Sequence, residues 1–147
     1  MTAFEPFIAK RYVRSRLIQS ATLAGLIGTS VYADVAPSGS AALYVLMTVV
    51  SAEDLMVVGA DRVWSNVLMQ VEAWGRTADD AVVAQVAAAI DGALHDTNGA
   101  MTGVDYGKGI VFSSTRERAL NLPPEVDGDV IWRRAGGEYR LKVQASA

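Results

Sequence analysis

The fold is decided by residues 28–94, which begin GTSVYADVAPSGSAALYVLMTVV and continue through VWSNVLMQVEAWG at 63–75. The run from Ala42 to Val50 is apolar and rich in β-branched residues, which predicts a central strand covered on both faces. Residues 63–74 alternate instead, and this alternation predicts a strand with one covered face and one face open to water or to a partner. The covered face would carry Val63, Val67, Met69, Val71 and Ala73, and the open face Trp64, Asn66, Gln70 and Glu72.

Between these strands lies the segment SAEDLMVVGADR, residues 51–62. It is too long for a tight hairpin and yet contains an apolar run, residues 55–58. Two interpretations fit: the strand pairing continues along a longer ribbon, or the segment is a projecting arm whose apolar tip docks on a neighbouring subunit. The arm hypothesis makes candidate interface residues of Glu53, Asp54, Leu55, Met56, Val57, Arg62 and Trp64.

The alanine-rich segment 78–94 predicts an amphipathic helix that is capped by Thr77, with Asp80 three residues further on. Its polar positions, Asp79, Gln85 and Asp91, would face away from the sheet. Small residues on the packing face allow a helix to lie close to a sheet. The predicted apolar stripe consists of Val82, Val86, Ile90 and Leu94, with Ala89 and Ala93.

The N-terminal region, residues 1–27, predicts a helix over 6–20 and a short helix from Ala21 to Ile27, which Gly28 ends. The apolar residues of the first helix recur at roughly helical spacing and are Ile8, Tyr12, Val13, Leu17 and Ile18. Pro6 suits a first helical turn, where its missing N–H removes no hydrogen bond. Residues 1–20 carry four basic side chains against Glu5 alone, so the rest of the chain holds the acidic excess of a protein with net charge −3. A basic arm on an acidic body is either a solvated helix face or a partner surface. The second interpretation adds Lys10, Arg11 and Arg14 to the candidate interface.

The C-terminal third predicts a strand over 109–115, a connector at Leu122-Pro-Pro-Glu125, and a hairpin over 129–144. That hairpin would consist of strands 129–134 and 138–144 around a Gly136-Gly137 turn. The order helix, strand, strand, helix, strand, strand, strand predicts an α+β fold. It would be one domain over residues 1–147: a mainly antiparallel β-sheet with the N-terminal helix and the central amphipathic helix packed against it.

The composition is that of a globular protein, with 51% hydrophobic and 20% charged residues in a chain of 147. No apolar stretch approaches the roughly 20 residues that span a bilayer, so we expect no membrane association. The chain has no cysteine, which excludes disulfides, thiolate catalysis and cysteine-ligated metals.

No catalytic constellation emerges from the residue types and their spacing. His95 is the one histidine, and its place after Leu94 predicts a cap at a helix C-terminus or a surface role. Adjacent carboxylates, as in Asp79-Asp80 and Glu53-Asp54, diverge on a helix and do not meet at one substrate atom. The glycine-rich segment 103–109 lacks the Gly-Lys-Ser/Thr ending of a phosphate-binding loop. We therefore expect no catalytic residues, no cofactor and no metal.

These segments, taken in order, resemble the small tail-completion or tail-to-head-joining family of long-tailed bacteriophages, which also occurs in prophages and gene transfer agents. The resemblance rests on the N-terminal helix, GTSVYADVAP at 28–37, ALYVL at 42–46, VLMQVEAWG at 67–75 and the helix over 78–94. It implies a structural virion protein of the tail or neck, assembled in the host cytoplasm, and no enzyme.

Within that family the resemblance implies a tail terminator, a homo-oligomeric ring, usually a hexamer, that caps the tail tube and stops its polymerisation. The implied partners are further copies of the chain, the tail tube protein and the head-tail connector or stopper protein, with DNA passing through the lumen. Other hypotheses are a head-side adaptor, a tail-tube subunit, or a small dimeric α+β protein that binds a ligand.

Overall fold

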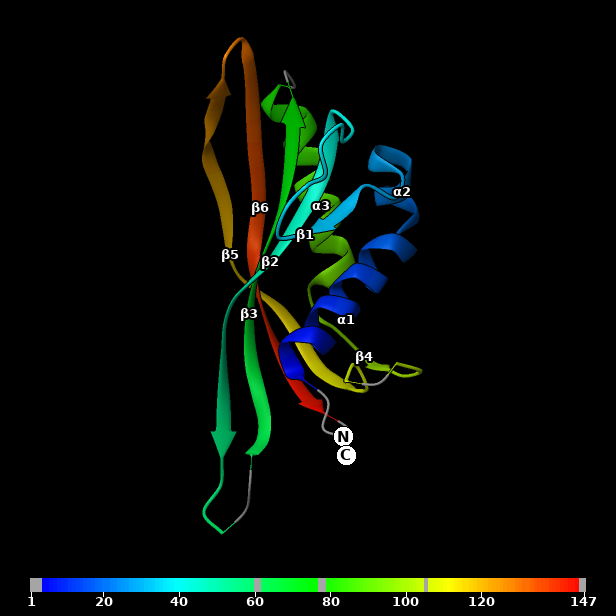
Figure 1. The fold of residues 1–147 in the computed structure, drawn as a ribbon, viewed down its shortest axis with the longest axis vertical. Helices are drawn as coiled ribbons and strands as arrows, with labels where there is room; N and C mark the ends of the chain where they lie inside the picture. Colours follow the sequence, from blue (N-terminus) through cyan, green and yellow to red (C-terminus); the bar gives the residue numbers. More distant parts are fainter. Residues whose placement is uncertain (1–3, 60–61, 77–78, 105, 146–147) are drawn as a thin grey trace.

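The chain folds into a twisted, curled sheet of six strands with three helices on one of its faces (Figure 1). The computed structural model describes residues 4–59, 62–76, 79–104 and 106–145. The strand order is β1-β2-β3-β6-β5-β4, and every neighbouring pair is antiparallel except β1 and β2. The predicted α+β class is therefore confirmed. The elements are α1 (Glu5–Gln19), α2 (Ala21–Ile27), β1 (Val31–Ala33), β2 (Leu43–Met56), β3 (Arg62–Arg76), α3 (Asp80–Leu94), β4 (Thr97–Met101), β5 (Gly109–Asp127) and β6 (Val130–Ala145).

Helix α1 begins one residue earlier than the sequence predicts, and its apolar stripe is buried against the sheet and α3. Ile8, Tyr12 and Leu17 are almost fully buried on that stripe. Ile18, which the spacing places on the same stripe, is instead 38% exposed. Among the described residues, no helix is long and apolar enough to cross a membrane.

Helix α3 begins later than predicted, and its cap is Asp79. The Asp79 carboxylate accepts a hydrogen bond from the backbone N–H of Val82 at 3.0 Å, which satisfies one of the free donors of the first turn. Thr77, the predicted cap, lies outside the described residues. The buried stripe contains Val83 rather than the predicted Val82 and otherwise follows the prediction closely; its members are Val83, Val86, Ile90, Ala93 and Leu94.

The core lies between the helices and one face of the sheet. The covered face predicted for β3 is confirmed at Val67, Met69, Val71 and Ala73, which are fully buried on the helix side. Strand β2 lies inside the sheet between β1 and β3, but the helices cover only one of its faces. The expected covering of both faces of β2 is therefore wrong.

Two hairpin arms extend from opposite ends of the sheet (Figure 1). One continues β2 and β3 through the segment predicted as loop or arm: Ser51 pairs with Leu68, and the register runs on to Leu55 opposite Trp64. This confirms the interpretation that strand pairing continues along the ribbon. We call residues 51–59 and 62–66 the β2–β3 arm. The other arm consists of β5 and β6 around the turn at Gly128, which has a φ of 60°.

The predicted C-terminal hairpin around Gly136-Gly137 is wrong. Strand β6 runs without a break through both glycines and pairs with β3 on one side and β5 on the other. A Cβ on Gly136 would lie 2.1 Å from the carbonyl oxygen of Val71 and 2.6 Å from the Cα of Glu72. Glycine stands here because the neighbouring backbone leaves no room for a side chain.

Two further features differ from the sequence prediction. The Leu-Pro-Pro-Glu segment, expected to be a connector, lies within β5 at a register shift between Leu122 and Glu125. Strands β1 and β4, of three and five residues, were not predicted. Short edge strands carry too little periodicity to be recognised from their own residues.

Candidate interaction surfaces

The basic residues predicted as a partner surface lie on α1, where Arg11 holds another segment of the chain. Its terminal nitrogens donate to the carbonyl oxygens of Gly107 and Thr102. A Cβ on Gly107 would lie 2.7 Å from the Cδ of Arg11. Arg11 therefore ties the glycine-rich segment after β4 to the helix, and a side chain at position 107 would displace that of Arg11.

The two other candidates on α1 also have partners within the chain. Arg14 donates to the carbonyl oxygen of Val31 at 2.8 Å, which anchors the start of β1. Lys10 forms an ion pair with Asp34 at 3.0 Å, and both side chains remain substantially exposed. Because exposed pairs contribute at most about 1 kcal/mol, this contact would yield readily to a partner.

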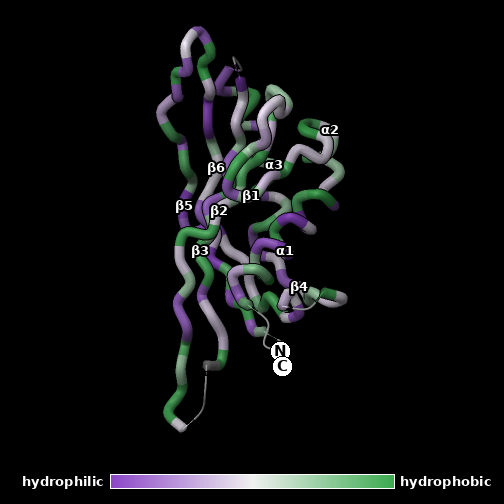
Figure 2. The backbone as a smooth tube through the Cα atoms, viewed as in Figure 1, coloured by the Kyte–Doolittle hydropathy of each residue, from purple (hydrophilic) through white to green (hydrophobic). Residues whose placement is uncertain are grey.

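The remaining candidates lie along the β2–β3 arm, and its end is apolar (Figure 2). Leu55 lies directly opposite Trp64 across the two strands. Met56 is 69% exposed, and Val57 and Val58 are exposed as well. Clustered exposed hydrophobic side chains of this kind mark an interaction site on a soluble protein.

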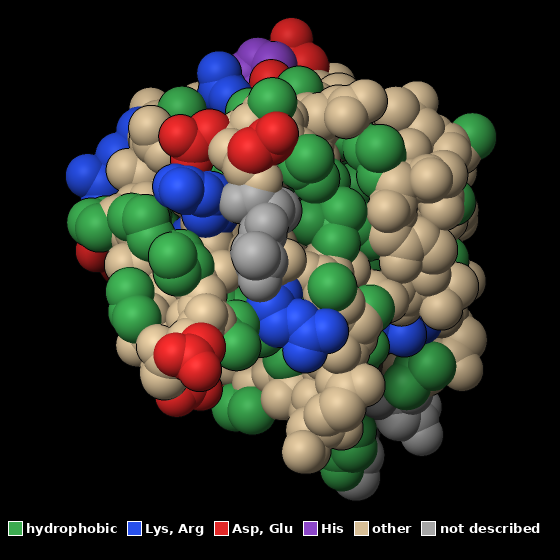
Figure 3. Space-filling view, turned by 90° about the horizontal axis from the view of Figure 1, so that it is seen from above, with side chains coloured by type: hydrophobic (Ala, Val, Ile, Leu, Met, Phe, Trp, Pro, Cys, Tyr) green, Lys and Arg blue, Asp and Glu red, His purple; other side chains and the backbone are tan. Residues whose placement is uncertain are grey.

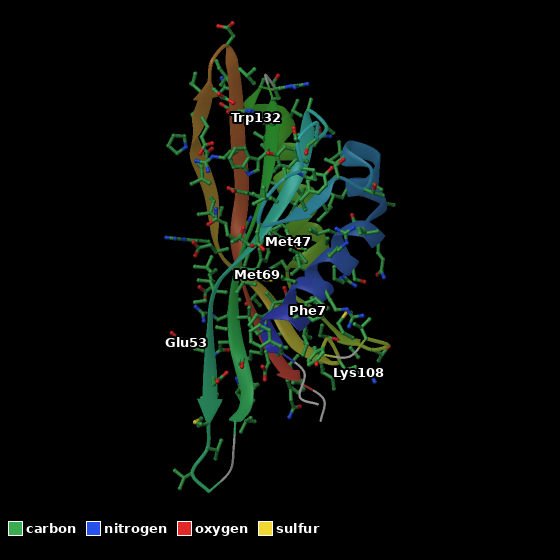
Figure 4. All side chains as sticks on the ribbon, viewed as in Figure 1. Phe7, Met47, Glu53, Met69, Lys108 and Trp132 are labelled. Atoms are coloured by element: carbon green, nitrogen blue, oxygen red, sulfur yellow. The ribbon has the colours of Figure 1, made fainter. Side chains whose placement is uncertain are left out.

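The polar candidates of the arm differ in their surroundings. Asp54 accepts a hydrogen bond from the hydroxyl of Ser65 at 2.5 Å, which joins the two strands of the arm. Glu53 lies on the other face and points away from the helices (Figure 4). The side chain of Arg62 lies outside the described part of the structure.

Trp64 borders a shallow hollow of about 250 Å³ beside the arm. The Nζ of Lys142 lies 5.7 Å from the centre of its indole ring, a cation–π contact. The other residues that line the hollow are Val63, Phe112 and Gln144.

An aromatic cluster that the sequence analysis did not single out lies towards the opposite end of the sheet, where Trp132 stands (Figure 4). Tyr44 stacks nearly parallel to Trp74 with ring centres 6.2 Å apart, and Trp132 meets Tyr44 edge-on at 5.6 Å. Tyr32 meets Tyr44 from the other side, and the guanidinium of Arg134 lies 4.9 Å from the Trp74 ring centre. The cluster borders a hollow of about 490 Å³.

Glu72 lies beneath this cluster and is only 5% exposed, although the alternation placed it on an open face. The prediction failed because the neighbouring aromatic side chains cover that face. One carboxylate oxygen accepts from the indole N–H of Trp74 at 3.1 Å. Burial, and then the charge of Glu72, raise the pKa of the Tyr44 hydroxyl. Only the cross-strand register brings these residues together, so nothing in their sequence spacing could have identified the cluster.

Opposite charges pair across β5 and β6 on the face that carries no helix. The hydrogen bond from Arg140 holds the pKa of the Glu117 carboxyl below its usual value. Figure 3 looks onto the end of the molecule that carries the β5–β6 turn and shows hydrophobic, basic and acidic side chains interspersed there. The pairs are Arg118–Glu138 at 2.6 Å, Arg134–Glu125 at 3.7 Å and Arg140–Glu117.

His95 caps the end of α3, as predicted, and its backbone N–H donates to the carbonyl oxygen of Asp91. Its Nδ1 accepts from the backbone N–H of Arg116 at 3.0 Å, so His95 joins α3 to β5. Asp91 does not face away as predicted, because it accepts from the Tyr139 hydroxyl at 3.0 Å and lies 3.6 Å from Arg116. Within the described ranges, no group of three or more His, Cys, Asp or Glu side chains is placed to hold a metal ion.

Comparison with known proteins identifies the family. The model described as Tail completion protein gp17 matches residues 11–121, which is more than half of the chain. The chain belongs to the tail completion protein gp17 family. It is a structural component of the virion tail and not an enzyme.

A solved structure gives independent support for the fold. A chain of the "Virion of native gene transfer agent (GTA) particle" is 23% identical, with a TM-score of 0.60 over 89% of this chain and 90% of that chain. At that level of identity the likeness concerns the fold alone. The search of curated proteins found no match.

Family membership also bears on the candidate surfaces. A tail completion protein acts through contacts with other proteins, and the candidate residues lie on two elements that could supply them, α1 and the β2–β3 arm. The side chains on α1 already hold parts of the chain together, whereas the apolar end of the arm is exposed.

Proposed function

We propose that this tail completion protein is a tail terminator. It caps the tail tube as a ring of identical subunits, usually a hexamer, stops the tube from polymerising further, and presents a surface to the head-tail connector. DNA passes through the lumen of this ring. The partners are therefore further copies of the chain, the tail tube protein and the connector or stopper protein.

The observation that carries this proposal is the exposed apolar end of the β2–β3 arm, on a chain of the tail completion family. A ring needs a contact that joins one surface of a subunit to a different surface of the next and closes by rotation. An arm that extends beyond the body of the subunit can reach such a neighbour. Leu55, Met56 and Val57 would be buried there, together with Trp64, which lies opposite Leu55.

The proposal is tested by the mass of the protein in solution, measured by light scattering over a range of concentration and salt, with and without tail tubes. We expect a discrete ring, or a monomer that forms rings only on tail tubes. A tight dimer at every concentration would contradict the terminator and favour the ligand-binding hypothesis.

Replacing both Leu55 and Met56 with Asp places two charges at the end of the arm, where we expect them to abolish ring formation or tube capping. The matched control is Val35→Asp, since Val35 is 77% exposed and lies in the loop after β1. That control should assemble normally. Unchanged assembly of L55D/M56D would exclude the arm from the contact.

A further inference from the structure

The two outer edges of the sheet are unpaired over part of their length. On one side, β1 pairs only with Val45–Met47, and among the described residues no strand pairs with that edge of β2 beyond Met47. On the other side, β4 reaches β5 only as far as Ser114. Unpaired edges expose backbone donors and acceptors, which makes them sites for pairing with another strand.

Along the outer edge of β5, the stretch best suited to pairing with another strand is short. Before this stretch, the backbone N–H of Arg116 already donates to the Nδ1 of His95 and is not available to another strand. After it, Pro123 and Pro124 have no backbone N–H to donate. The window between them is residues 118–122, a length typical of a strand in a sheet.

On β2, the corresponding window is residues 51–55. It begins after the register shift between Val49 and Ser51, contains no proline or glycine, and leads to the apolar end of the arm. Glu53 lies opposite Asn66 of β3, which in turn lies opposite Lys142 of β6. Because residues opposite each other share a face of the sheet, Glu53 lies with Lys142 on the face without helices. Arg118 of the β5 window lies on that same face, where it pairs with Glu138. The two windows therefore carry opposite charges on the same face of the sheet.

The strand directions also fit. Because β2, β3, β6 and β5 alternate in direction, β5 runs opposite to β2. A copy related by rotation keeps these directions, so its β2 would pair antiparallel with β5. We infer that residues 51–55 of one subunit add to residues 118–122 of the next as an antiparallel strand. Aligning the windows end to end places Glu53 opposite Leu120 and diagonal to Arg118, within reach of its long side chain.

The offset between the windows sets the geometry of the ring. Glu53 is aligned with Lys142 on β6, whereas Leu120 is aligned with Gly136, about 20 Å away along that strand. Each subunit adds four strand spacings, about 19 Å across the sheet. The sheet therefore shifts about 20 Å along its strands for every 19 Å added across them. Such a sheet closes into a ring when its strands tilt about 45° from the ring axis, which is at the upper end of the tilt found in closed barrels. The helices of all subunits then lie on the same side of one continuous sheet.

This inference rests on the proposed ring and is tested by disulfide trapping, since the chain has no cysteine of its own. Ala52 faces the helix side of the arm, as Ala119 and Asn121 do on β5, and all three are exposed. Within one subunit, β3 and β6 separate these positions by at least about 14 Å, too far for a disulfide. A disulfide between A52C and N121C or A119C can therefore form only between copies.

We expect a mixture of the A52C and N121C proteins, oxidised under native conditions, to give a disulfide-linked heterodimer on a denaturing gel. The double variant A52C/N121C should give a ladder that ends at the number of subunits in the ring. A stronger product with A119C would support the pairing with the register shifted by two residues. The matched control is S51C with N121C, which should not cross-link, because neighbouring residues point to opposite faces of a strand.

The outcomes separate this inference from the proposed function. Rings by light scattering without any A52C cross-link to N121C or A119C would overturn the strand pairing and leave the terminator in place. Cross-links of A52C to itself would overturn the pairing in favour of a two-fold contact between β2 strands. Cross-linked chains that never close into rings would support the pairing and contradict the terminator.

Discussion

Gly136 lies where β3 and β6 approach each other closely, so replacing it with alanine should force the two strands apart. The new Cβ would lie 2.1 Å from the carbonyl oxygen of Val71, whereas non-bonded atoms are most favourably placed at about 3.5–4.0 Å. Overpacking of this kind costs about 1–3 kcal/mol, and each ladder hydrogen bond lost adds about 1 kcal/mol. Replacing a strand glycine with alanine by itself raises the unfolding free energy by about 0.5–1 kcal/mol, because the unfolded chain has less backbone freedom to lose. We expect G136A to lose roughly 2–3 kcal/mol of unfolding free energy.

The assay is urea unfolding at a fixed protein concentration, with thermal melting as a second readout. For a chain of this size each kcal/mol lowers the melting temperature by about 2–4 °C. The matched control is Gly92→Ala in α3, where a Cβ would meet nothing within 4 Å, and which should gain about 0.5–1 kcal/mol. If G136A were as stable as the wild type, β6 would not pass between β3 and β5 at this point, and the reasoning would be refuted.

Two further predictions concern single contacts. Tyr139→Phe removes the hydroxyl that donates to Asp91 and should lower the unfolding free energy by about 1 kcal/mol in urea titrations; an unchanged value would mean that the hydrogen bond contributes no net stability. The pKa of Glu117 is lowered by its hydrogen bond from Arg140, so its contribution to stability is present above the unfolded pKa, near 4.5, and is lost as the pH falls through the folded pKa. Glu117→Gln should therefore reduce the loss of unfolding free energy on acidification. The effect is about 0.5 kcal/mol at most, because the pair is exposed. A variant that loses more unfolding free energy than the wild type as the pH falls would contradict this.

Much of the fold could be predicted because the spacing of apolar residues within one helix or strand indicates which of its faces is buried. The buried face of β3 and the helices α1 and α3 follow directly from residue spacing. Element ends were predicted less well than element types, since the cap of α3 is Asp79 and not the predicted Thr77. The resemblance in residues 28–94 led to the family that the comparison establishes over 11–121.

The candidate site was predicted in part. The exposed, apolar end of the β2–β3 arm could be recognised because its hydrophobic run lies in a polar segment. The positions of Arg11 and Arg14 could not, because their acceptors are backbone carbonyls of distant segments. Whether a basic side chain meets solvent or a carbonyl depends on which loop folds over it, and spacing along a helix carries no information about that.

The sequence by itself determined the helices α1 and α3, the buried face of β3 and the tail completion family, because each of these depends on residues close together in the chain. Tertiary structure alone decided that Gly136-Gly137 is the interior of a strand and not a turn. It also decided that Tyr44, Trp74 and Trp132 form one cluster. A glycine pair permits either a turn or a close approach of strands, and only the neighbouring backbone of β3 selects between them. The same cross-strand register leaves the windows at 51–55 and 118–122 open, since pairing is a relation between strands that no single segment contains.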